Sequence, residues 1–255
     1  WGDSRIHLTA YPGPGLKFKK WVCAPVREVY NAGRTASGGG CAGASGGINT
    51  EKRGNKGMSH DNARASRVSA GEGLERLLSG NRRHASGREV HPHQDPARRE
   101  EIVSGQHPFA VILGCSDSRV PPEILFDCGL GDLFVVRTAG HCLDEAASGS
   151  IQYAVEHLGV ELVVVLGHAF CGAVTAVLED AGAAGHLKNL LDRLRPVVGG
   201  LPRPGGLERA IAENVHRTVA ELKSEAWARK VTVLGMHYDL RSGRVRLEPP
   251  AAGEE

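Results

Sequence analysis

The strongest constraint on the fold is a short apolar run that ends directly in a thiol, a carboxylate and a guanidinium. Residues 109–114 read Phe-Ala-Val-Ile-Leu-Gly, and residues 115–119, Cys-Ser-Asp-Ser-Arg, follow without an intervening loop. An aliphatic run bounded by Pro108 and Gly114 is typical of a strand buried on both faces of a parallel sheet. The polar cluster then lies at the carboxyl end of the strand, where open α/β sheets place their ligands.

A second stretch has the same layout. Residues 162–167 read Leu-Val-Val-Val-Leu-Gly, and His168 and Cys171 follow them. We expect strands over 109–114, 132–137, 161–167 and 231–238, and, after a tight Ser242-Gly243 turn, over 244–247. Helices are expected from Gly71 onward and over 96–104, 121–126, 145–158, 172–180, 187–194 and 208–227. This alternation predicts a Rossmann-like α/β fold, with a mostly parallel β-sheet, flanking helices, right-handed crossovers and one antiparallel edge strand.

The length of 255 residues allows one α/β domain of roughly 180–200 residues and a tail. We expect a disordered N-terminal extension over 1–70, one folded domain over 71–248 and a disordered tail over 249–255. The glycine-rich run 37–47 cannot hold a helix or pack a core, and Met58 is the first methionine. Met58 is therefore a candidate native start.

Charge and cysteine content exclude several classes of protein. Residues 1–57 carry nine Lys and Arg against three acidic residues, whereas the rest carries 22 against 26, so the folded part is mildly acidic and nothing in it suggests a nucleic-acid surface. No apolar run approaches the ~18 residues of a membrane span. The six cysteines do not have the regular spacing of a small secreted disulfide scaffold. We expect a cytoplasmic protein with two metal thiolates and four free cysteines.

The residues that follow the two buried strands have the chemistry of a zinc site. Zinc prefers four tetrahedral ligands from Cys, His and carboxylate groups, and catalytic sites leave one position to water. His168 and Cys171 can reach one ion from a tight turn, and a crossover can make the strand of Cys115 an immediate neighbour. Each residue alone is explained more simply, as a small buried hydrophobe or a hydrogen-bonded histidine. Two ligand sets after two strands favour Zn²⁺ with an open position, or a site closed by Asp117.

Asp117 and Arg119 suggest a catalytic role beside this metal. Two thiolates cancel the charge of Zn²⁺, so the ion acidifies its water less than an all-histidine site does. Asp117 can orient and help deprotonate that water, and Arg119 can hold the carboxylate ionised and away from the metal through a bidentate pair. An ordinary surface ion pair would contribute little, but a position directly after a buried strand is unusual for one.

Several longer motifs resemble the β-class carbonic anhydrases. They are CSDSRVPPE at 115–123, GDLFVVRTAG at 131–140, GSIQYAVEHLGV at 149–160 and GHAFCGAV at 167–174, with weaker likeness in LLSGNRRHA at 77–85, ENVHRTVAEL at 213–222 and YDLRSGRV at 238–245. The resemblance covers roughly Gly71–Leu247. It implies a carbonate dehydratase, a lyase that reversibly hydrates CO₂ to bicarbonate and a proton, with one Zn²⁺ per subunit held by Cys115, His168 and Cys171.

The resemblance also implies roles for further residues. Asp117 and Arg119 match the catalytic dyad of the family. Gln106 matches a glutamine that binds substrate, usually from the partner subunit, and the Gly172 N–H matches a second donor to substrate. Phe134, Ala139 and Tyr153 fall where the family lines its apolar CO₂ pocket, although the two aromatic residues also suit a plain core. The family implies a homodimer or a higher even oligomer. His141 departs from the pattern, because members often carry asparagine there.

Two other functions remain open from the sequence. Hydrolysis of CS₂ or COS on the same scaffold is one, because both molecules are linear and apolar like CO₂. A non-catalytic, zinc-stabilised regulatory module is the other. The presence of Asp117, Arg119 and Gln106 argues against such a module, because a purely structural zinc needs none of them.

Overall fold

The computed structural model describes residues 68–198 and 206–249. The expected extension up to residue 67, with Met58, and residues 250–255 of the expected tail lie outside the described residues. The strands are β1 (Ala110–Cys115), β2 (Leu133–Thr138), β3 (Leu162–His168), β4 (Thr232–Asp239) and β5 (Arg244–Leu247). All five expected strands are therefore present, and their bounds agree with the sequence prediction to within one residue.

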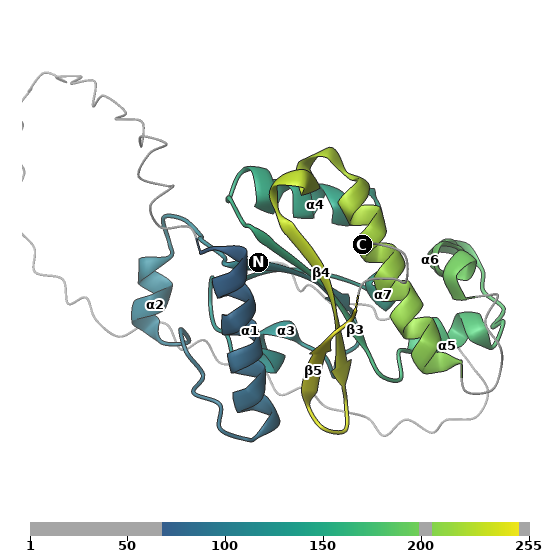
Figure 1. Cartoon of the computed structure of the whole chain (residues 1–255), viewed down its shortest axis with the longest axis horizontal. Coiled ribbons are helices and arrows are strands. Elements are labelled where there is room, and N and C mark those ends of the chain that lie inside the picture. The colour runs from purple at the N-terminus through teal and green to yellow at the C-terminus, as the bar shows by residue number, and fades with distance from the viewer. Residues whose placement is uncertain (1–67, 199–205, 250–255) are drawn as a thin grey trace, which may run out of the picture. The chain divides into compact units, whose positions relative to one another are not determined.

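The strands form a single sheet in the order β2-β1-β3-β4-β5, of which β3, β4 and β5 are labelled in Figure 1. β1 pairs in parallel with both β2 and β3, and β3 pairs in parallel with β4. β5 runs antiparallel to β4 after a turn in which Asp239 Oδ1 accepts a hydrogen bond from the Ser242 N–H at 2.7 Å and Gly243 adopts a φ of +70°. The predicted α/β architecture with one antiparallel edge strand is confirmed.

Helices cover both faces of this sheet. They are α1 (Ala70–Ala85), α2 (Pro96–Glu101), α3 (Pro122–Leu125), α4 (Glu145–Glu156), α5 (Gly172–Leu178), α6 (Gly185–Val198) and α7 (Leu207–Ser224), with short 3-10 helices η1 (Ala139–His141) and η2 (Ala226–Lys230). Side chains alternate between faces along a strand. Ile112 and Val164 accordingly belong to a core with α1, α3, α5 and α6, whereas Val111 and Val163 belong to a core with α4, η2 and much of α7.

The first helix is fixed to the sheet by a buried asparagine. Asn81 Nδ2 donates to the carbonyls of Leu125 and Gly243 at 3.1 and 2.9 Å, and its Oδ1 accepts from the Val245 N–H at 2.8 Å. The preceding residue, Gly80, lies so close to the turn after α3 that a Cβ atom there would meet the Phe126 carbonyl oxygen. α1 is therefore joined both to α3 and to the turn before β5.

Two helices, α2 and α7, end three residues earlier than the sequence predicts. Asp95 caps α2 as expected, with its side chain accepting from the Arg98 N–H at 2.9 Å, but the helix ends at Glu101 instead of residue 104. Ile102 has φ −91° and ψ 2°, and Val103 is 77% exposed, so no apolar contact extends the helix. α7 stops at Ser224 because Glu225 is extended, and η2 carries the chain onward to β4. None of the helices in residues 68–198 and 206–249 has an apolar stretch sufficient to span a bilayer.

Candidate metal centre

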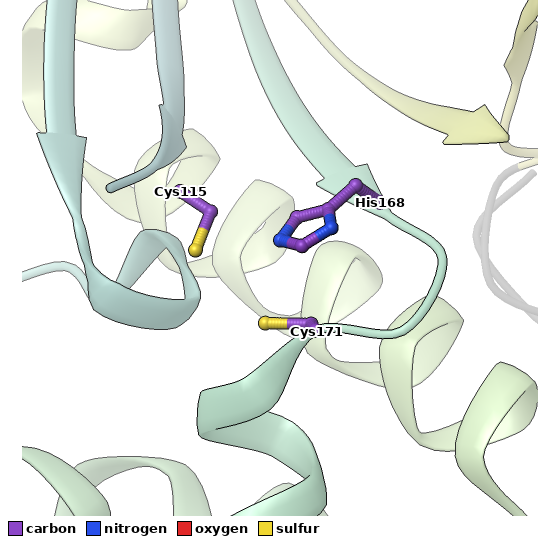
Figure 2. A group of neighbouring side chains, drawn as sticks. All are labelled: Cys115, His168 and Cys171. Carbon is purple, nitrogen blue, oxygen red and sulfur yellow. The ribbon is translucent and has the colours of Figure 1, made fainter. Parts of the chain in front are cut away.

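Three potential metal ligands meet at the carboxyl end of the sheet (Figure 2). Cys115 ends β1, His168 ends β3, and Cys171 caps the N-terminus of α5. Because β1 and β3 are parallel neighbours, their carboxyl ends lie at the same edge. One ligand atom from each residue lies within 4.8 Å of the other two. The structure thus brings together the three residues that the sequence singles out.

The orientation of His168 suits a metal ligand. Its Nδ1 lies 2.9 Å from the Ala169 carbonyl oxygen, so Nδ1 carries the proton and Nε2 is the free acceptor. Nε2 is buried and has no hydrogen-bond partner among the described residues. Metal-bound histidines commonly donate their other ring nitrogen in this way, which fixes the tautomer. A buried acceptor without a partner is costly unless it binds a cation.

The turn that carries Cys171 is also held in place. The Ala169 N–H donates to the Tyr238 carbonyl at 2.9 Å, and Phe170 adopts a φ of +56°. The guanidinium of Arg241 lies 5.4 Å from the centre of the Phe170 ring. These contacts return the chain sharply after β3, which places the Cys171 thiol beside the His168 ring.

The pKa values of the two thiols are shifted in opposite directions. A hydrogen bond with Cys171, together with those from the N–H groups of Asp117 and Gly140, lowers the pKa of Cys115 to about 3 despite its burial. The bond with Cys115 and burial raise the pKa of Cys171. One thiolate is thus stabilised by the protein alone, whereas two thiolates at this distance require a cation. An N/S donor set of this kind fits Zn²⁺.

Asp117 and Arg119 form the predicted bidentate pair beside the three ligands. Arg119 Nε lies 2.9 Å from Asp117 Oδ1, and Nη2 lies 2.6 Å from Oδ2. These bonds, with the Arg119 N–H, lower the pKa of Asp117 to about 2. The same Nη2 donates to the Phe170 carbonyl at 3.3 Å, which connects the pair to the turn of Cys171. Asp117 is not among the three clustered ligands.

Arg137 is a contributor that the sequence reasoning missed. It comes from β2, and its Nε donates to the Cys115 carbonyl at 2.8 Å while its Nη2 donates to the Asp117 carbonyl at 2.5 Å. One guanidinium therefore holds the backbone on both sides of Ser116. The sequence did contain a signal for this role, because the charged Arg137 directly follows the apolar run 133–136 within the motif GDLFVVRTAG.

Asn214 of α7 supports the other side of the site. Its Nδ2 donates to the Gly140 carbonyl at 3.0 Å and lies 3.2 Å from His141 Nε2, and the Gly140 N–H donates to Cys115 Sγ at 3.2 Å. His141 is buried, has a φ of +44°, and has its pKa lowered to about 4 by burial. The departure from the family pattern at 141 thus lies next to a ligand. Asn214 was missed because it reads as a polar position of an amphipathic helix.

The remaining expected residues divide into two groups. Gly172 and Ala139 directly follow Cys171 and β2 at the edge that carries the three ligands. Phe134 lies within β2, and its ring centre is 6.3 Å from that of Tyr153. Tyr153 belongs to α4 and is 47% exposed. Gln106 is exposed and precedes β1, at the end of the strand away from Cys115.

Comparison with known proteins identifies the family. A family model described as carbonic anhydrase matches residues 110–245. A carbonic anhydrase of Mycolicibacterium smegmatis is 46% identical over 185 residues, which cover 67% of this chain and 89% of that protein. The chain belongs to the carbonic anhydrase family.

Further relatives place the chain in the β class of carbonic anhydrases. Carbonic anhydrase 2 of Mycobacterium tuberculosis (strain ATCC 25618 / H37Rv) is 45% identical over 185 residues, covering 67% of this chain and 89% of that protein. A solved β-carbonic anhydrase of Sordaria macrospora, described as tetrameric, aligns with a TM-score of 0.55 and 27% identity over 68% of this chain and 95% of that chain. The activity of this chain is that of a carbonic anhydrase, the hydration of CO₂, and Cys115, His168 and Cys171 are its metal-binding group.

Proposed function

We propose that Cys115, His168 and Cys171 bind one Zn²⁺ per subunit and that Asp117, Arg119 and a neighbouring subunit complete the site for CO₂. A tetrahedral zinc with bonds of about 2.0–2.3 Å keeps its ligand atoms roughly 3.3–3.8 Å apart. The three ligand atoms lie within 4.8 Å of one another, so a small inward movement is enough. The buried, unpartnered Nε2 of His168 is the observation that carries this proposal.

When bound, zinc supplies the Lewis acidity that makes water nucleophilic near neutral pH. The carboxylate of Asp117 accepts a hydrogen bond from the attacking water and orients it. Arg119 keeps this carboxylate ionised and, through its bond to the Phe170 carbonyl, fixes its position relative to the Cys171 turn. The Gly172 N–H, at the start of α5, is a donor for an oxygen of the substrate, and Ala139, directly after β2, lines the apolar approach for CO₂. Phe134 pairs with Val111 near the other end of β1 and lies close to Tyr153, so these two residues, like Gln106, line the approach from the neighbouring subunit.

The Asp117→Asn variant tests the role of the carboxylate. We expect zinc content and fold to be retained and the CO₂ hydration rate, measured by stopped flow with a pH indicator, to fall by about 10²–10⁴-fold, the usual contribution of a positioned acid–base group. Asp192→Asn is the matched control, because Asp192 also pairs with a cation, Lys188 at 2.5 Å, but on an exposed helix face. Full activity of Asp117→Asn at normal zinc content would contradict the assigned role.

Gln106 reaches the site only from a second copy of the chain. The strand between Gln106 and Cys115 runs over Ala110–Cys115, and its five steps of about 3.3 Å place its two ends roughly 17 Å apart. The exposed Gln106 therefore cannot bind substrate at the metal centre of its own chain. We propose a homodimer, or a higher even oligomer, in which each Gln106 serves the neighbouring centre. The half-exposed residues of β2, which ends the described sheet, are consistent with a subunit contact.

Complementation between two inactive variants tests this sharing. Gln106→Ala removes the substrate donor, and Cys115→Ser removes a metal ligand. In a mixed dimer, the metal centre of the Gln106→Ala subunit receives an intact Gln106 from the other subunit. Co-expression should therefore recover about a quarter of the wild-type rate, since half of the dimers are mixed and each has one complete centre. Mixed dimers with no recovered activity would show that Gln106 acts within its own chain or not at all.

The cysteines and the site also bear on the cellular compartment and on the choice of substrate. The described cysteines Cys115, Cys128, Cys142 and Cys171 are all free, and this supports a reducing, cytoplasmic compartment. Cys23 and Cys41 lie outside the described residues. No observation on the described residues favours CS₂ or COS over CO₂.

A further inference from the structure

A pocket of about 370 Å³ lies between the last turns of α1 and the start of β5, and none of its lining residues belongs to the metal centre. Its apolar lining comes from Leu78, Ala85 and Val245. Three arginines, Arg82, Arg88 and Arg244, also line it, and they come from α1, the loop after it and β5. A small apolar pocket bordered by three guanidinium groups has the composition of a binding site for an anion.

The three arginines share a second property. None forms an ion pair with a carboxylate of the described residues, whereas Arg76, Arg83, Arg98, Arg119, Arg195 and Arg246 all do. Within residues 68–198 and 206–249, the one side-chain bond of these arginines runs from Arg88 Nε to the Ser86 hydroxyl at 3.1 Å and does not use the terminal nitrogens of Arg88. Cations favour the negative end of a helix dipole, and this accounts for Arg82 in the last turn of α1. It does not account for Arg244 on β5.

The backbone around the pocket is fixed, so the arginines are presented from a rigid frame. The N–H groups of Gly87 and Arg88 donate to the carbonyls of His84 and Arg83, both at 3.0 Å, and Gly87 has a φ of +63°. This is the usual glycine-dependent end of a helix, and it returns Arg88 toward the last turn. Asn81 bonds the residues on either side of Arg244, namely Gly243 and Val245. The same asparagine precedes Arg82, so the positions of Arg82 and Arg244 are coupled.

We propose that this pocket binds a small oxyanion with two or more negative charges, carried by phosphoryl or carboxylate groups. The planar guanidinium fork pairs with either group through two parallel hydrogen bonds. Three such groups with no carboxylate partner leave a net positive charge that a single monovalent ion does not neutralise. The site is independent of the proposed zinc chemistry and of the oligomeric state.

Calorimetric titration of the zinc-loaded protein with inorganic pyrophosphate, and separately with citrate, tests the site. We expect saturable binding of one anion per chain, and the preferred probe distinguishes phosphoryl from carboxylate ligands. Arg244→Ser and Arg82→Ser should each weaken binding by about tenfold or more, the effect of losing one charge-assisted hydrogen-bonding group. Arg99→Ser and Arg229→Ser are matched controls, because these arginines also form no ion pair among the described residues but lie on α2 and η2. They should change the dissociation constant by less than about twofold.

Two outcomes would overturn the proposal. One is the absence of saturable binding of both probes at low ionic strength. The other is an equal loss of binding in the pocket variants and in the controls, which would show a general effect of net charge. CO₂ hydration by Arg244→Ser is measured in parallel and should match the wild type, so failure of this proposal and failure of the zinc mechanism remain distinguishable.

Discussion

Two glycines of α1 should respond in opposite ways to the same substitution. A Cβ atom at Gly80 would lie 1.8 Å from the Phe126 carbonyl oxygen and 2.7 Å from its carbonyl carbon, whereas a Cβ at Gly71 meets nothing within 4 Å. Both residues are helical, so the intrinsic preference for alanine over glycine, up to ~1 kcal/mol in a helix, acts in the same direction at both. Only the contact with the turn after α3 differs.

The size of the effect at Gly80 follows from what has to move. An ordinary contact requires the helix and the turn to separate by more than an ångström, and both contact atoms are backbone. That separation strains the Asn81 bonds to Leu125 and Gly243 and the ion pair of Arg83 with Asp127. Overpacking alone costs about 1–3 kcal/mol, and each lost buried hydrogen bond costs about 1 kcal/mol more. We expect Gly80→Ala to lose at least about 3 kcal/mol of unfolding free energy.

Thermal unfolding at equal zinc content and protein concentration measures this difference. For a domain of this size, about 3 kcal/mol lowers the midpoint by roughly 6–12 °C. Gly71→Ala should raise the midpoint slightly or leave it unchanged. A Gly80→Ala protein that unfolds within a degree or two of the wild type would refute the close contact between α1 and the turn, and with it the way in which α1 is fixed to the sheet.

Two further predictions concern acid and metal. The pKa of Asp127 is lowered, because the bonds from Arg83 and from the N–H groups of Val90 and His91 outweigh the opposing effect of burial. The stabilisation by the Asp127 carboxylate is therefore complete above the pKa of about 4 that an aspartate has in the unfolded chain, and it is lost as the pH falls below that value. In urea titrations, the difference in unfolding free energy between the wild type and Asp127→Asn should shrink over that pH range. A difference that stays constant would contradict this prediction. Removing zinc with a chelator should lower the unfolding midpoint and adding zinc should restore it, because His168 Nε2 is otherwise buried without a partner. A midpoint unaffected by complete metal removal would contradict a buried metal site.

The sequence alone was sufficient for the ligands of the metal centre. The apolar runs 109–114 and 162–167 are too short for buried helices and contain no polar residue, so they indicate strands of a parallel sheet. The polar residues that follow each run must then lie at the carboxyl ends of these strands. The pairing of β1 with β3, which joins Cys115 to His168, was a prediction of topology, and it is confirmed. Asp117 and Arg119 lie two residues apart, so their pairing depended only on local geometry.

Residues whose role depends on long-range contacts could not be found in this way. Arg137 and Asn214 act on backbone carbonyls that are 22 and 74 residues distant, and nothing in the spacing of the sequence connects a side chain to a distant carbonyl. The early end of α2 has a similar origin, since Val103 is exposed and its burial against the rest of the fold does not support a longer helix. The arginine pocket depends on the turn before β5 meeting the end of α1, a contact between segments more than 150 residues apart.

Arg137 gives the outermost parallel strand a direct part in the reacting centre. A neighbouring chain that bonds to the outer edge of β2 would hold the strand whose guanidinium supports both the Cys115 and the Asp117 carbonyls. A change in quaternary arrangement would then be transmitted to the metal ligand and to the carboxylate together, through a single side chain and with β1 and β3 at rest. In such an arrangement, loss of the contact at β2 would lower the rate of CO₂ hydration through Arg137, without any change in the three metal-binding residues.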